Sequence, residues 1–84
     1  MQPKAYRKAA IEAAQSALLE KVRNNPEKVM EGLLKAPHLL YGVHDVAAIF
    51  DIMLEKGMYD KLVQLAGATS LPKTVRSILV SKLL

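Results

Sequence analysis

Apolar residues recur every three or four positions along most of the chain, which is the spacing of one face of an α-helix. No stretch shows the strict apolar/polar alternation of a half-buried β-strand. The pattern therefore predicts an all-α fold, a compact bundle of about five short helices.

The first predicted helix covers residues 4–24, because no Gly or Pro interrupts this stretch. Its recurring apolar positions are Ile11, Ala14, Leu18 and Val22. Six alanines keep one flank of the helix narrow: Ala5, Ala9, Ala10, Ala13, Ala14 and Ala17. Since small residues let another helix approach closely, we expect this helix to pack tightly within the domain or across a homodimer interface.

A second, short helix is predicted to follow and to end near Lys35. Asn25 is the candidate N-cap and Pro26 suits the first helical position. The apolar positions of this helix are Val29, Met30, Leu33 and Leu34. Pro37 disfavours a helical residue before it, so residues 37–42 are expected to form a connector, and residues 4–35 an N-terminal helix pair.

Residues 44–84 are predicted to form a three-helix unit with helices over 44–56, 58–66 and 71–84. The first of these has the clearest apolar face, formed by Val46, Ile49, Phe50, Met53 and Leu54. Gly57 suits the left-handed position that ends it. The next helix presents Leu62, Leu65 and Ala66 inward. The last helix is amphipathic, with an apolar stripe of Val75, Ile78, Leu79 and Leu83.

The composition narrows the class of protein. A chain of 84 residues suits one domain, 1–84, and its 51% hydrophobic content leaves apolar surface for a partner, of which a homodimer is the simplest case. The absence of cysteine excludes disulfides, thiolate nucleophiles and cysteine-bound metals. The longest apolar run, residues 46–50, is far below the roughly 18–20 residues of a membrane span, so we expect no membrane insertion and a cytoplasmic location.

Catalytic and metal-binding motifs are missing from the sequence. It contains no nucleophile elbow, phosphate loop, dinucleotide fingerprint or calcium loop. His38 and His44 are six residues apart across Gly42, which is not the one-turn spacing of a helical metal site. We therefore predict no enzymatic activity, no catalytic residues, no metal and no cofactor.

Charge is distributed unevenly. Residues 1–35 carry seven basic and four acidic side chains, a net +3. Residues 36–70 carry two and four, a net −2, and residues 71–84 carry three and none, a net +3. A purely basic C-terminal segment favours a polyanionic partner, although it also fits a solvated helix face.

The last forty residues contain the features of a helix-turn-helix. Ala66 is small enough for two helices to cross closely, and Pro72 is tolerated in the first turn of a helix. With Leu65-Ala66, Thr69, Leu71-Pro72-Lys73, Thr74-Val75 and Ile78-Leu79, residues 45–84 resemble the start of winged-helix repressors of the isocitrate lyase regulator type. The chain departs from that motif at Ser70, where the motif has glycine, and at Arg76, where it has an aliphatic residue.

This resemblance implies a transcription-regulator-like domain that binds double-stranded DNA. The last helix would enter the major groove, where arginine pairs with guanine and lysine reaches phosphates. Its candidate contacts are Lys73, Thr74, Arg76 and Ser77. Candidate contacts to the DNA backbone on the preceding helix are Tyr59, Lys61 and Gln64.

A helical protein–protein interaction or adaptor module is the alternative. Such a module binds a partner helix through an apolar groove. The candidate surfaces are the apolar stripe of the last helix (Val75, Ile78, Leu79 and Leu83) and the alanine flank of the first.

Overall fold

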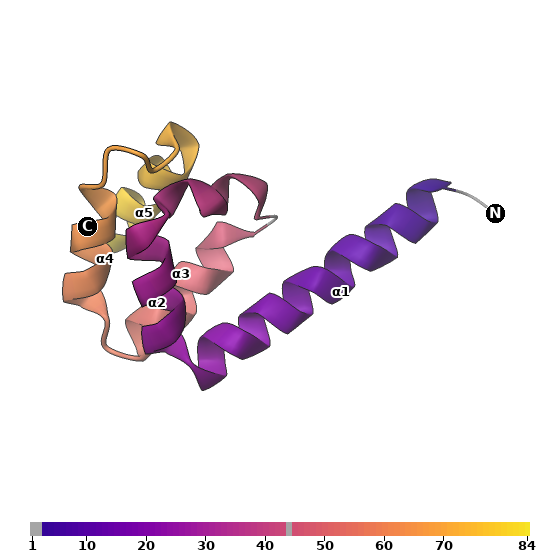
Figure 1. Ribbon diagram of the computed structural model, residues 1–84, viewed down its shortest axis with the longest axis horizontal. Helices are drawn as coiled ribbons and strands as arrows, with labels where there is room; N and C mark the ends of the chain where they lie inside the picture. Colours follow the sequence, from indigo (N-terminus) through magenta and orange to yellow (C-terminus); the bar gives the residue numbers. More distant parts are fainter. Residues whose placement is uncertain (1–2, 44) are drawn as a thin grey trace.

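A computed structural model describes residues 3–43 and 45–84, with side chains from Arg7 onward, and all of its regular structure is helical. The described residues form five α-helices and one 3-10 helix, whose arrangement can be followed in Figure 1. They are α1 (Pro3–Asn24), α2 (Pro26–Lys35), η1 (Pro37–Gly42), α3 (Val46–Glu55), α4 (Tyr59–Ala66) and α5 (Lys73–Leu83). The predicted all-α bundle is confirmed, and the expected connector 37–42 is itself the 3-10 helix η1.

The core is built around α3, which packs against α1, α4 and α5. Its predicted apolar face is correct, since Ile49, Phe50 and Met53 are at most 1% exposed. Burying an aromatic or large aliphatic side chain contributes roughly 1.5–3 kcal/mol, so this helix supplies much of the stability. The other buried core residues are Val22, Met30, Leu33, Leu40, Val46, Ile52, Met58, Leu62, Leu65, Leu71, Val75 and Leu79.

The ends of α3 are fixed by local hydrogen bonds. At its start, the Asp45 carboxylate Oδ1 accepts a hydrogen bond from the Ala48 amide at 3.2 Å. At its end, Gly57 has φ of 76°, the left-handed conformation that was predicted for it. The Met58 amide donates to the Met53 carbonyl oxygen at 3.0 Å across this glycine. These contacts form a Schellman motif, which satisfies carbonyls that the helix itself leaves free.

Several predicted boundaries need correction. The last helix begins at Lys73 instead of residue 71, because Leu71 is buried in the preceding turn and Pro72 occupies the N-cap position. The third helix begins at Val46, whereas the predicted start at His44 lies outside the described residues. Asn25 occupies the N-cap position of α2, but its side chain makes no capping hydrogen bond.

The N-terminal part of α1 projects away from the bundle (Figure 1), so of the two alternatives expected for this helix, close packing within the domain holds only for its C-terminal part. Residues 7–14 are all exposed, with Ile11 at 41%. Only the C-terminal part packs, through buried Val22 and half-buried Leu18. No helix in the described part of the chain, the 22-residue α1 included, is long and apolar enough to cross a membrane.

Candidate partner-binding groove

The residues predicted to contact DNA lie on α4 and α5, which pack against each other. Those with exposed side chains on α5 are Lys73, Thr74 and Ser77, and those on α4 are Tyr59, Lys61 and Gln64. The two helices are separated by a six-residue turn, 67–72. Arg76, by contrast, is only partly exposed.

Arg76 is engaged with the turn that precedes its own helix. Its guanidinium Nη2 donates hydrogen bonds to the carbonyl oxygens of Ala68, at 2.6 Å, and Leu71, at 3.4 Å. Hydrogen bonds from a charged donor are stronger than neutral ones, so the contact ties α5 to the turn.

Two further side chains of this face are also engaged within the chain. Lys82 Nζ lies 2.7 Å from the Asp51 carboxylate on α3. The Tyr59 hydroxyl donates to the Leu83 carbonyl oxygen at 3.3 Å. The C-terminal segment has three basic residues. Among the described residues, Lys73 is the one of these three that makes no ion pair and no side-chain hydrogen bond.

The apolar stripe of α5 packs into the protein's own core. Val75 is 7% exposed and Leu79 is fully buried, while Ile78 and Leu83 pack against the core from its edge. The expectation that this stripe docks on a partner is wrong for its central residues, because their surface is already covered. The exposed apolar positions of α4 and α5 are instead Tyr59, Val63 and Val80, with Leu84 after the end of α5.

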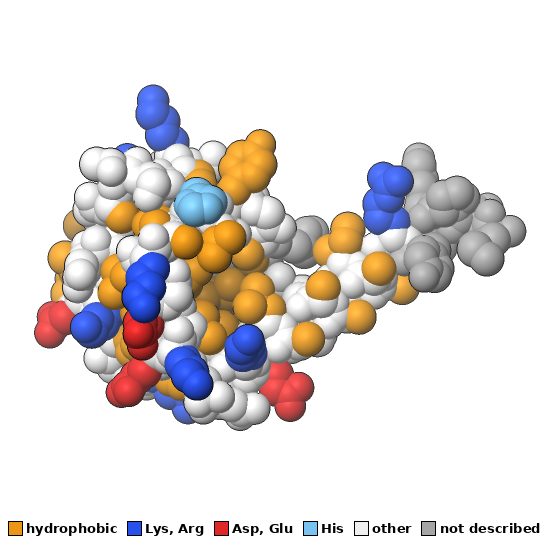
Figure 2. Space-filling model, in the orientation of Figure 1, with side chains coloured by type: hydrophobic (Ala, Val, Ile, Leu, Met, Phe, Trp, Pro, Cys, Tyr) orange, Lys and Arg blue, Asp and Glu red, His pale blue; other side chains and the backbone are white. Residues whose placement is uncertain are grey.

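An apolar groove opens at the base of the projecting part of α1. It encloses a cavity of about 380 Å³ between α1, α2, η1 and α3. Figure 2 shows it as a hollow in a continuous apolar area beside the helix that leaves the bundle. Its apolar lining consists of Leu18, Val29, Leu33, Leu39, Leu40, Val43 and Ile49, with Gly32 in the α2 wall and Lys21 and Lys28 completing it.

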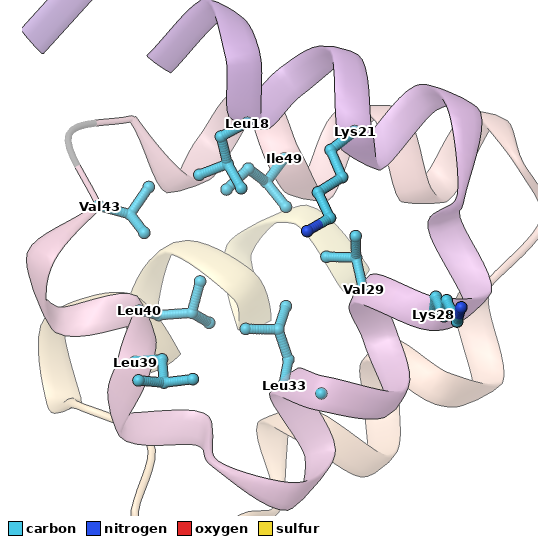
Figure 3. A pocket seen from close by; sticks show the side chains of 10 residues that line it. Leu18, Lys21, Lys28, Val29, Leu33, Leu39, Leu40, Val43 and Ile49 are labelled. Atoms are coloured by element: carbon cyan, nitrogen blue, oxygen red, sulfur yellow. The ribbon is translucent and has the colours of Figure 1, made fainter. Parts of the chain in front are cut away.

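The two turns of η1 set the depth of this groove. Pro37 is buried at the start of η1, and Leu40, one 3-10 turn later, is 1% exposed. Leu39, in contrast, is 60% exposed and lies at the mouth (Figure 3). The opposite wall comes from α2, where Val29 and Leu33 lie one turn apart. The groove thus combines a buried apolar floor with an exposed apolar rim.

The charged residues of the groove are both cationic. Lys21 extends from α1 towards Val29 of α2 (Figure 3), and Lys28 stands on the α2 wall. No acidic residue lines the cavity, and neither lysine forms an ion pair within residues 7–43 and 45–84. An apolar cavity bordered by two ammonium groups fits a partner with an apolar surface flanked by acidic groups.

Sequence reasoning did not find the groove, because its walls come from four elements whose packing the apolar pattern does not specify. The available signal was Leu39 and Leu40 in the connector, since two adjacent leucines in a 3-10 helix cannot both face the core. Of the two histidines, His38 is exposed, and His44 lies outside the described residues. Within the described part, no three His, Asp or Glu residues are placed to hold a metal.

Comparison with protein-family models, with curated proteins and with solved structures gives no match for this chain. The geometry of the groove and of the α5 surface is therefore the basis for choosing between them. The lining of the groove is more apolar than that of the depression along α5 formed by Lys73, Arg76, Ser77 and Val80.

Proposed function

We propose that the protein is a helix-binding interaction module that holds a helical segment of a partner protein in the groove between α1, α2, η1 and α3. The observation that carries this proposal is the apolar cavity of about 380 Å³ with exposed Leu39 at its mouth. Protein-binding grooves of this kind receive an amphipathic helix through apolar side chains spaced at i, i+3, i+4 and i+7.

The size and lining of the groove support a short apolar anchor sequence. Contiguous apolar surface that is left open costs solubility unless a partner covers it. Each aliphatic side chain that the cavity accommodates would contribute roughly 1.5–3 kcal/mol on burial. Such binding is weak to moderate, as is usual for adaptor modules after the entropic cost of association.

The test is a fluorescence-anisotropy titration with a labelled 16-residue helical peptide that carries a leucine stripe and uncharged glutamine flanks. The parent protein is expected to bind it, and Leu39→Asp should weaken binding by at least about tenfold, because a carboxylate at the mouth must be desolvated. Tyr41→Asp is the matched control, since Tyr41 is 84% exposed in the same 3-10 helix but does not line the cavity. Equal binding by both variants would refute the proposal.

Binding of duplex DNA through α5 is the second candidate, because Lys73, Thr74 and Ser77 are exposed in its first turns. It ranks lower because Arg76 and Lys82 are engaged within the chain. Titration of random-sequence duplex at about 50 and 200 mM salt tests it, since each phosphate contact adds roughly one unit to the slope of log affinity against log salt. Loss of affinity with Lys73→Ala would support it, and no binding at low salt would reject it.

A further inference from the structure

Gly32 is a glycine that the fold does not require. It lies within α2, where glycine costs roughly 0.5–1 kcal/mol relative to alanine. The positive-φ glycine of the described chain is Gly57, so Gly32 is not there for a left-handed backbone. A Cβ built on Gly32 would meet no atom within 4 Å, so internal packing does not exclude a side chain either.

A reason for the glycine at position 32 lies in its place on the groove wall. It lines the groove between Val29 and Leu33, and it is exposed. A wall without a side chain leaves the α2 backbone open to the close approach of another backbone, as small residues do where helices cross closely. A partner whose backbone approached α2 at this point would offset the cost of the glycine.

The lysines of the groove supply an independent observation about charge. Lys21 on α1 and Lys28 on α2 belong to the two helical walls, and no acidic residue lines the cavity. Both lysines lie at the end of the groove where α1 meets α2 (Figure 3), so an occupant that carries carboxylates beside its apolar stripe would meet them there. Charge complementarity of this kind fixes the orientation of a partner and raises its rate of association.

From these two features we infer that the occupant is an amphipathic helix whose apolar stripe is flanked by acidic residues and whose backbone crosses α2 at Gly32. This inference rests on the proposed function, and it adds the chemistry of the partner. The exposed part of α1 from a second copy is a poorer fit, because its residues 7–14 carry Arg7 and Lys8 against one carboxylate, that of Glu12.

The experiment compares two labelled helical peptides with the same leucine stripe, one flanked by glutamates and one by lysines. At about 50 mM salt the protein should bind the glutamate peptide about tenfold more tightly, and the double variant Lys21→Glu, Lys28→Glu should reverse this preference. Lys8→Glu, Lys35→Glu is the matched control on the same two helices, at lysines that do not line the cavity. This control variant should still bind the glutamate peptide more tightly than the lysine peptide, as the parent protein does.

Gly32→Leu tests the crossing point. Leucine is a good helix former and its Cβ would meet no atom within 4 Å at this position, so the variant should keep the helical circular-dichroism spectrum and lose the binding of both peptides. Gly42→Leu is the control, because the space around Gly42 is also open but it does not line the cavity. Parent-like binding by Gly32→Leu would overturn the crossing at this residue.

The outcomes separate the inference from the proposed function. Equal affinity for the two peptides, with both lost in Leu39→Asp, would overturn the acidic partner and leave the helix-binding groove standing. Binding of neither peptide would overturn both. If sedimentation velocity shows a dimer that Leu39→Asp dissociates, the groove binds a second copy of the chain. If the protein cosediments with phosphatidylglycerol vesicles and binds no peptide, the groove binds a lipid surface. Either result would overturn the inference.

Discussion

The guanidinium of Arg76 is hydrogen-bonded to the carbonyl oxygen of Ala68 at 2.6 Å, so a side chain in the second turn of α5 holds the turn that leads into that helix. A second, longer contact to Leu71 closes the same loop. Arg76, which the sequence predicted to contact DNA, is here hydrogen-bonded within the folded structure. This difference separates the effect of Arg76 on stability from any effect on binding.

Arg76→Ala is expected to lower the free energy of unfolding by about 1–3 kcal/mol, because it leaves two carbonyl oxygens of the turn without their charged donor. Urea denaturation followed by circular dichroism measures this change. Lys73→Ala, at an exposed position three residues earlier, should change stability by less than about 0.5 kcal/mol. Similar stability for both variants would show that the hydrogen bonds of Arg76 contribute nothing.

Gly57→Ala should destabilise the protein by about 1–2 kcal/mol, since an L side chain at φ of 76° is strained and the Schellman motif after α3 depends on this conformation. The shift in the thermal midpoint measures it. Gly42→Ala provides the comparison, because Gly42 has no positive φ and open space around its Cα. An equal shift in the two variants would contradict the role given to Gly57.

Asp45→Ala should cost about 1 kcal/mol, because the Ala48 amide at the start of α3 loses the carboxylate that accepts its hydrogen bond. Asp45→Asn should retain most of that stability, since asparagine caps helices about as well as aspartate. Chemical denaturation of the two variants side by side is sufficient. If both lose the same stability, the charge and not the hydrogen bond is what matters at this helix end.

Leu79→Asp is expected to abolish folding, because Leu79 is fully buried and an aspartate there would place a carboxylate in the apolar core. Even Leu79→Ala should cost roughly 2–5 kcal/mol. Leu39→Asp should leave the circular-dichroism spectrum and thermal midpoint nearly unchanged, since Leu39 is 60% exposed. A folded Leu79→Asp variant would show that α5 is not packed as described.

Ile11→Ala and Val22→Ala compare the two ends of α1. Val22 is fully buried, so its truncation should destabilise by roughly 1–3 kcal/mol. Ile11 is 41% exposed in the projecting part, and its truncation should change stability by less than about 0.5 kcal/mol. A large effect at Ile11 that grows with protein concentration would show that this face is covered by another copy.

The sequence was sufficient to predict the elements whose apolar spacing matches their burial. The face of α3 around Phe50 and the glycine stop at Gly57 are two examples, because burial and conformational strain at these positions leave few alternatives. It failed for α1, since alanine is compatible with either a buried or an exposed face and Ile11 alone does not decide between them. Helical periodicity shows which face is apolar, but not whether anything covers it.

The same limit explains the binding sites. The helical pattern predicted that the side chain of Arg76 faces solvent. It could not show the contact with two carbonyl oxygens, because these belong to a turn whose path no local rule specifies. The groove depends on how α1, α2, η1 and α3 meet, and three of its residues, Leu18, Gly32 and Val43, had no reason to be grouped from the sequence. Surfaces formed between elements become visible only in three dimensions.

The length of the projecting helix would amplify any tilt at its packed end. About fifteen residues separate Arg7 from Val22, which is roughly 22 Å along a helix at 1.5 Å per residue. A tilt of about 10° at the packed end therefore moves the outer turns by roughly 4 Å. Leu18 and Lys21 of the groove lie near the packed end of α1. A molecule bound there would contact the helix close to the point of tilting, so a small displacement at the groove would become a larger one at the outer turns.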